Sequence, residues 1–303
     1  MCSPSSPSAP KRQPPSESWE HHKLYRRVRE ALLVVPQYFE SQIRIVGIPA
    51  TDIFAFNTIL GATIEDRVVD TLNQMRPVWD PEGDYAFYSF VRQSQTFPDV
   101  LFRKPGGEPP ILGIELKGWY VLAKEGVPSF RYKVTPGACA PSSLLAVYPW
   151  YLSEVVSGTP KLLDPYIELA RYVAEYRNWY WEHGRQSTGN PVIVATWDTP
   201  FPSKGDGIQD TATRDQGGNF GRIARVGLLD DFCSRVGQHK LAGIASAHWL
   251  KFFGLFKDSE DSATVEKTIE TMRSHVHVAG QHSDEGFERL LGLLREIAAL
   301  LLA

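Results

Sequence analysis

The sequence contains little cysteine and no strong excess of either charge. Its 303 residues include three scattered cysteines, Cys2, Cys139 and Cys233, with no CxxC pair among them. This spacing argues against a disulfide scaffold or a cysteine zinc site, and it fits a reducing cytoplasm. The formal net charge is −3, so no global basic field indicates a nucleic-acid partner, although a local basic patch is compatible with this value.

Long hydrophobic runs and a recognisable signal peptide are absent as well. The chain has no stretch of about 18 consecutive apolar residues, so we expect no membrane span and no membrane partner. Residues 1–18 are rich in proline and serine and lack the apolar region of a signal peptide, which predicts a disordered leader. No clear linker divides the rest, and we expect a single domain over 19–303 in the cytoplasm.

The composition that is present is typical of a folded protein with a large core. Hydrophobic residues make up 43% of the chain and charged residues 22%, both near the globular average. Helical spacing and cap residues predict helices over about 19–42 with a break at Pro36, over about 58–75, and from Asp164–Pro165 onward. A further helical region is expected over about 220–256, followed by a final amphipathic helix.

Strand-like segments lie between these helices. Their expected ranges are 85–93, 96–102, 109–123, 143–153 and 191–198. The first three are separated by short breaks that contain proline or glycine and predict an antiparallel hairpin or meander. The order of elements therefore predicts an α/β (α+β) fold with additional C-terminal helices.

Charged residues occur inside the most strand-like stretch, FPDVLFRKPGGEPPILGIELKGWY, residues 97–120. Successive side chains of a strand point to opposite faces, so Glu115 and Lys117 share one face. Asp99 begins the preceding strand. If the two strands pair across the KPGGE break, Asp99 can approach Glu115.

The preceding helix contributes a further acid. Glu65 is spaced helically relative to Val68, Val69 and Leu72, which places its carboxylate on the apolar, core-facing side. A lone charge there is costly unless it is paired or bound to a metal. Three acids and one lysine are therefore expected to converge at a sheet edge beneath a helix.

Pro98-Asp99 followed by Glu115-Leu116-Lys117 resembles the PD-(D/E)xK signature of the restriction-endonuclease-like nucleases. The resemblance covers about residues 58–198: a helix with an acid, a strand with Pro-Asp, a strand with Glu-x-Lys, then a helix and a further strand. It implies a restriction-endonuclease-like core, with a mixed central sheet flanked by helices. It also implies that the two motif acids bind Mg²⁺ and that the lysine assists attack of water on a phosphodiester. Glu65 matches the additional acid that the preceding helix often contributes.

The residue types suit this chemistry. Mg²⁺ prefers carboxylate oxygens and keeps several waters, so Asp99 and Glu115 are candidate ligands, with the backbone carbonyl of Leu116 as a third. The metal lowers the pKa of a bound water, and Lys117 would position or deprotonate that water and stabilise charge on the phosphoryl group. We therefore expect a Mg²⁺-dependent endodeoxyribonuclease that cuts double-stranded DNA, most like a type II restriction enzyme. A palindromic target would imply a homodimer.

Three alternatives stay open. Glu115 and Lys117 are also compatible with a solvated pair on a surface hairpin. Within the same superfamily, a repair or recombination nuclease would use the same residues. A non-catalytic DNA-binding protein that kept the fold is the third alternative, and it would show no Mg²⁺-dependent cleavage.

Residues outside the motif are candidates for DNA contacts. A polar, glycine-rich stretch carries side chains suited to phosphates and base edges, namely Lys204, Arg214, Asn219, Arg222 and Arg225. An ordinary surface loop is the alternative. The aromatic stretch from Tyr172 to Trp181 has helical spacing, which is more typical of a core helix than of a platform for stacked bases. His275, His277 and His282 lack a supporting zinc pattern and favour a structural or surface role.

Overall fold

The computed structural model describes residues 7–46, 56–93, 96–123, 128–185, 187, 189–214 and 220–255, with isolated positions 263, 267, 270, 292 and 295 beyond them. The three histidines at 275, 277 and 282 lie outside the described residues, as does nearly all of the final helix. Within the described part, no helix is long and apolar enough to cross a membrane.

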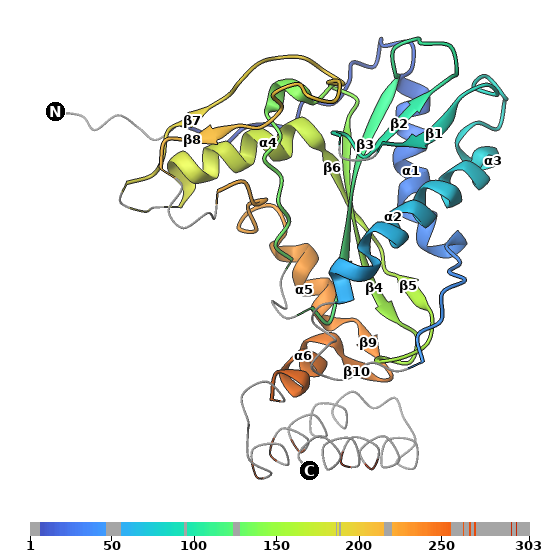
Figure 1. Cartoon of the computed structure of the whole chain (residues 1–303), viewed down its shortest axis with the longest axis vertical. Coiled ribbons are helices and arrows are strands. Elements are labelled where there is room, and N and C mark those ends of the chain that lie inside the picture. The colour runs from blue at the N-terminus through green and yellow to red at the C-terminus, as the bar shows by residue number, and fades with distance from the viewer. Residues whose placement is uncertain are drawn as a thin grey trace.

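A mixed six-stranded sheet forms the centre of the fold, and the antiparallel meander expected over 85–123 is confirmed (Figure 1). Its strands are β1 (Ser89–Arg92), β2 (Val100–Arg103), β3 (Leu112–Tyr120), β4 (Leu144–Leu152), β5 (Pro160–Leu162) and β6 (Tyr166–Leu169). β3 pairs β4 in parallel, and β5 and β6 both pair β4 in antiparallel fashion along its other edge. The two central strands are buried on both faces, which explains why they read as continuous apolar runs.

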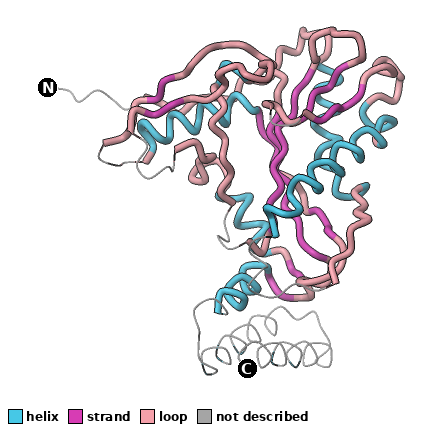
Figure 2. The backbone as a smooth tube through the Cα atoms, viewed as in Figure 1, coloured by secondary structure: helices cyan, strands magenta, loops and turns pink. Residues whose placement is uncertain are grey.

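Helices cover both faces of the sheet. One face packs against α1 (His22–Tyr38), α2 (Phe56–Gln74) and the short α3 (Arg76–Trp79), as Figure 2 shows. On that face the Tyr148 hydroxyl of β4 donates to the Leu32 carbonyl of α1 at 2.9 Å. The other face packs against α4 (Ala170–Trp179) and α5 (Asp230–Gln238), where Trp119 contacts Phe232. The sheet flanked by helices is therefore present.

Several expected elements differ from the sequence prediction. The helix predicted from Asp164–Pro165 is wrong, because residues 166–169 form β6 and α4 begins at Ala170. Pairing of β6 with residues 144–147 of β4 overrides the local cap signal. The break predicted at Pro36 is also absent, since α1 continues to Tyr38.

The later part of the chain is less helical and less strand-like than expected. Of the strand predicted over 191–198, only β7 (Ile193–Val194) is present. It pairs β8 (Thr211–Ala212) outside the main sheet. Val192 and Val194 are exposed there, so this apolar run does not mark a core strand. The region 220–256 contains α5, a hairpin of β9 (Lys240–Leu241) and β10 (Ile244–Ala245), and α6 (Ser246–Leu255).

The described part of the leader has no helix or strand over residues 7–16, but it contacts the domain. The Arg12 Nε atom donates to Glu168 of β6 at 2.7 Å, and the Arg12 guanidinium lies 4.6 Å above the Tyr172 ring. The Trp179 indole donates to the Pro7 carbonyl at 2.8 Å. Residues 7–12 therefore lie along β6 and α4.

A buried ion pair joins three segments on the α4 side of the sheet. Arg177 and Asp210 have fully buried side chains whose Nη2 and Oδ2 atoms lie 2.5 Å apart. The Asn178 side chain also donates to Asp210 at 2.7 Å, and Arg177 donates to the Tyr132 carbonyl. Burial lowers the pKa of Arg177, although Asp210 opposes that effect. This pair ties α4 both to the segment after β3 and to the polar loop.

Asp210→Asn should destabilise the protein by about 3 kcal/mol, because it leaves the Arg177 charge buried without a counter-charge. The free energy of unfolding is measured by urea denaturation. Asp198→Asn is the matched control, since Asp198 pairs Arg171 of the same helix but is 75% exposed. The control should cost less than about 1 kcal/mol. Equal losses in the two variants would show that the buried pair contributes no more to the free energy of unfolding than the exposed pair does.

Candidate active site

The central feature of the site is an open stretch along one edge of β3. β2 pairs β3 only from Val100 opposite Ile114 to Phe102 opposite Leu112. β3 continues to Tyr120, and β4 alone among the described strands pairs it there. The Val121 amide donates toward β4, to the Trp150 carbonyl, so the amides of Leu116 and Gly118 point the other way, to the open edge.

Gly113 allows the chain before β2 to lie close to β3. A Cβ atom at this position would be 2.6 Å from Pro98 Cγ and 3.0 Å from the Phe201 ring. Any larger residue would push Pro98 away from the strand. The absence of a side chain at Gly113 therefore keeps Asp99, the next residue, against the open edge of β3.

Two hydrogen bonds between backbone amides and carboxylates connect the Asp99 and Glu115 segments. The Leu116 amide donates to Asp99 Oδ2 at 2.9 Å, and the Asp99 amide donates to Glu115 Oε2 at 3.3 Å. The strand pairing that the sequence predicted across the KPGGE break thus brings the two acids together. Glu115 is buried, and Asp99 has a side chain that is about one-quarter exposed.

Lys117 lies between these carboxylates. Its Nζ atom is 2.6 Å from Glu115 Oε1 and 3.6 Å from Asp99 Oδ2. Burial alone would lower the pKa of Lys117, but the neighbouring carboxylates outweigh it and raise that pKa above its ordinary value. Lys117 is therefore an ammonium ion in this arrangement, suited to hydrogen-bond donation rather than to proton abstraction.

Glu65 approaches the same place from α2. Burial raises the pKa of Glu65, and the nearby Asp99 raises it further, while Lys117, Arg92 and a hydrogen bond from the Gly118 backbone act in the opposite direction. Arg92, the last residue of β1, has its Nη2 atom 3.5 Å from Glu65 Oε2. The helix α2, the residue just before β2 and the strand β3 thus bring together the four residues that the sequence selected.

Glu115 has an unusual proton affinity. Burial raises its pKa to about 7, with a contribution from Asp99, even though Lys117 lowers it. The pKa values of Glu115 and Glu65 are both raised, chiefly because burial disfavours their ionised forms, and the nearby Asp99 adds to this effect. An additional cation at this edge would be stabilised.

The donor set fits Mg²⁺ held by few protein ligands. Among the described residues, no three Asp, Glu, His or Cys side chains are grouped closely enough to hold a metal ion. The described residues therefore form no closed protein cage for a metal ion. Asp99 and Glu115 still offer two carboxylates from neighbouring strands, and Mg²⁺ is commonly bound by one or two carboxylates with water and substrate phosphates as the other ligands. The Leu116 carbonyl shares the open side with its amide, as the backbone geometry of a strand requires.

The residues selected as DNA contacts do not join this cluster as a group. Lys204 and Arg214 are exposed in the polar loop, and Asn219 lies outside the described residues. Arg222 and Arg225 line a separate pocket beside the helical turn that follows α4. Sequence reasoning missed Arg92, although its place at the end of a strand preceding the Pro-Asp motif is a usable signal.

A scan against protein-family models and searches of curated proteins and solved structures gave no match to this chain. The argument for function therefore depends on the residues and their geometry.

The raised pKa of Glu115 predicts a specific pH dependence of stability. The folded protein keeps the Glu115 proton up to about pH 7, whereas an unfolded glutamate releases it near pH ~4.3. Between these values the folded state binds more protons, so the free energy of unfolding falls as pH rises. Relative to Glu115→Gln, the wild type should lose about 3 kcal/mol between pH ~4.5 and ~8.

Urea denaturation across this pH range measures the difference. Glu17→Gln, which removes an exposed carboxylate in the leader, is the control for net charge. Parallel stability curves for the wild type and Glu115→Gln would contradict the raised pKa.

Proposed function

We propose that the protein is a Mg²⁺-dependent endodeoxyribonuclease that hydrolyses phosphodiester bonds in DNA by the chemistry of PD-(D/E)xK nucleases. The observation that supports this most is Lys117 within 4 Å of both Asp99 and Glu115, at an open sheet edge that Glu65 also approaches. The resemblance of the motif and the spatial arrangement are independent arguments, because letter spacing does not by itself bring side chains together.

The burial of these charges favours a functional role over a surface hairpin. Exposed Glu–Lys pairs contribute little to stability and remain solvated. Glu115 is only 7% exposed, and its ionised form is disfavoured in the folded protein. A strand selected for stability alone would carry an apolar residue at this position, since desolvating a carboxylate costs several kcal/mol.

Each residue of the cluster would have a distinct part in hydrolysis. Asp99 and Glu115 would hold Mg²⁺, which when bound lowers the pKa of a water and neutralises phosphate charge. Lys117 would donate hydrogen bonds to a phosphate oxygen and orient the attacking water, as its raised pKa favours the protonated form. Glu65 would hold a further water or accept a proton, because its raised pKa makes it a better base than an ordinary glutamate.

The biological setting follows by analogy with the same resemblance. We propose sequence-specific cleavage of double-stranded DNA in the cytoplasm, as in a type II restriction enzyme. A homodimer would follow if the target is palindromic. A repair or recombination nuclease would cut branched or damaged DNA instead of giving discrete fragments from a plasmid.

Purified protein should cut a mixture of DNA molecules in the presence of Mg²⁺, and EDTA should stop the reaction. Lys117→Ala should slow cleavage at least about 100-fold, because charge developing on the phosphate loses its hydrogen-bond donor. DNA binding should persist. Cleavage is followed on gels, and sequencing of the cut ends reports specificity and stagger.

Lys161→Ala is the control for loss of a lysine, since Lys161 lies exposed on β5, on the far side of β4 from β3. The site assignment is wrong if Lys117→Ala and Glu115→Ala both cut at the wild-type rate.

Mg²⁺ should stabilise the wild type more at pH ~8 than at pH ~5.5, because at the lower pH it must displace the Glu115 proton. At a concentration ten times the dissociation constant, the gain is about 1.4 kcal/mol. Thermal unfolding with and without Mg²⁺ measures it. Glu17→Gln should keep this gain and Glu115→Gln should lose it, whereas an equal gain at both pH values would count against Glu115 as a ligand.

A further inference from the structure

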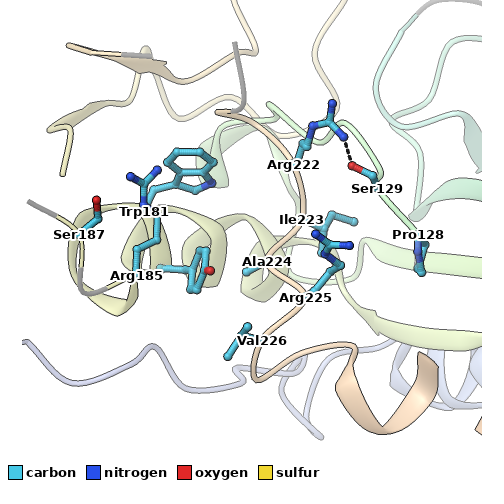
Figure 3. Close-up of a pocket in the computed structure, with 11 residues that line it drawn as sticks. Pro128, Ser129, Trp181, Arg185, Ser187, Arg222, Ile223, Ala224, Arg225 and Val226 are labelled. Carbon is cyan, nitrogen blue, oxygen red and sulfur yellow. Dashed lines mark hydrogen bonds between the residues drawn. The ribbon is translucent and has the colours of Figure 1, made fainter. Parts of the chain in front are cut away.

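A second cluster of charge lies in a pocket of about 830 Å³ on the α4 side of the molecule (Figure 3). The pocket lies between the π-helical turn Tyr180–Gly184 that continues α4, the segment at Pro128–Ser129 and residues 222–226. Arg185, Arg222 and Arg225 contribute to its lining, and none of the eleven described lining residues is acidic. It shares no residue with the Asp99–Glu115–Lys117 cluster.

Backbone pairing fixes the segment that carries two of these arginines. Arg222 forms an antiparallel bridge with Arg131, and the Ile223 amide donates to the Phe130 carbonyl at 3.0 Å. Gly221 has φ of +89° and lies so close to Lys133 that a Cβ atom would overlap the lysine side chain. The pocket wall is thus built by contacts with the chain that follows β3.

The charges in the pocket suit an anion. Arg222 Nη1 donates to the Ser129 hydroxyl, which orients one guanidinium at the wall. Arg185 and Arg225 form ion pairs with none of the described residues. Arg222 and Arg225 come from one side of the pocket, and Arg185 lies across from them beside Trp181 (Figure 3). Guanidinium matches the geometry of phosphate, so an anion is favoured beside Arg222 and Arg225.

Aromatic groups lie beside the arginines. The Arg185 guanidinium lies 4.2 Å from the centre of the Trp181 ring, and Trp181 itself is buried and held by an edge-to-face contact with Phe220. Tyr180 adds a second ring to the lining. Planar guanidinium and aromatic groups stack on nucleobases, and this interaction tolerates any base. The volume is in the range of small-molecule sites.

We propose that this pocket binds one nucleotide unit, with its phosphate beside Arg222 and Arg225 and its base against Tyr180 and the Arg185–Trp181 stack. The unit is either a free mononucleotide or part of a DNA strand. This binding is separate from hydrolysis at the acidic cluster and requires no metal.

Calorimetric titration of the full-length protein with deoxyadenosine monophosphate in EDTA tests the proposal. The nucleotide should bind, whereas deoxyadenosine should bind at least about tenfold more weakly because it lacks the phosphate. Equal affinity for nucleotide and nucleoside would overturn the proposal. EDTA prevents metal-dependent cleavage, so the result is the same whether or not the protein is a nuclease.

Arg225→Gln and Arg185→Gln should each weaken nucleotide binding about tenfold, with circular dichroism and the unfolding midpoint unchanged. Both side chains can be changed without removing the Arg222–Ser129 contact. Arg29→Gln is the matched control, because Arg29 is an exposed arginine of α1 on the other side of the sheet. Wild-type affinity in both pocket variants would also overturn the proposal.

A 5′-phosphorylated single-stranded oligonucleotide separates the two sources of the nucleotide. If a strand enters the pocket, the oligonucleotide competes with deoxyadenosine monophosphate, and Arg225→Gln weakens both. If the ligand is a free nucleotide, the oligonucleotide does not compete while the mononucleotide still requires Arg225. Either result supports the pocket, and an unchanged mononucleotide affinity in Arg225→Gln counts against both.

Discussion

The acidic cluster depends on a mismatch in the lengths over which β3 pairs its two neighbours. The parallel ladder with β4 holds β3 from Ile114 to Tyr120, whereas the antiparallel ladder with β2 ends at Ile114. Amides beyond that point must find other acceptors, since unpaired buried N–H groups are costly. Asp99 accepts from Leu116, and Glu65 accepts from the Gly118 backbone. Two carboxylates thus replace the carbonyls of a missing strand.

That arrangement also sets the electrostatics. Amide donors and Lys117 stabilise the carboxylates as anions, while burial and mutual repulsion favour their protonated forms. For Glu65 and Glu115 the second effect is larger, and their pKa values rise. For Lys117 the acids outweigh burial. The cluster therefore contains a protonated lysine beside two glutamates whose ionised forms are disfavoured. A bound cation would stabilise the ionised glutamates, and the lysine could interact with an anionic substrate.

Local periodicity was enough to predict the core of the site. The two-residue period of a strand placed Glu115 and Lys117 on one face, and the helical period of α2 placed Glu65 toward the sheet. Features set by distant pairing were not predictable in the same way. Residues 166–169 carry a helix-start signal yet extend along β4. Arg177 pairs with Asp210, 33 positions further along the chain. Arg185 and Arg222 line the same pocket although no spacing rule relates their positions in the sequence.

The segment that follows β3 connects the two clusters physically. Tyr132 lies within electrostatic reach of Glu115, its hydroxyl donates to the Ala170 carbonyl at 2.9 Å, and its own carbonyl accepts from Arg177. The neighbouring Arg131 pairs Arg222 at the wall of the arginine pocket. The buried Arg177–Asp210 pair therefore supports one stretch of chain that borders the acids on one side and the arginines on the other. Such a pair is seldom kept for stability alone, because apolar residues of similar volume often stabilise a core as well or better. What the contacts show is that the pair fixes the segment around Tyr132 against α4, and that this segment reaches both groups of charged residues.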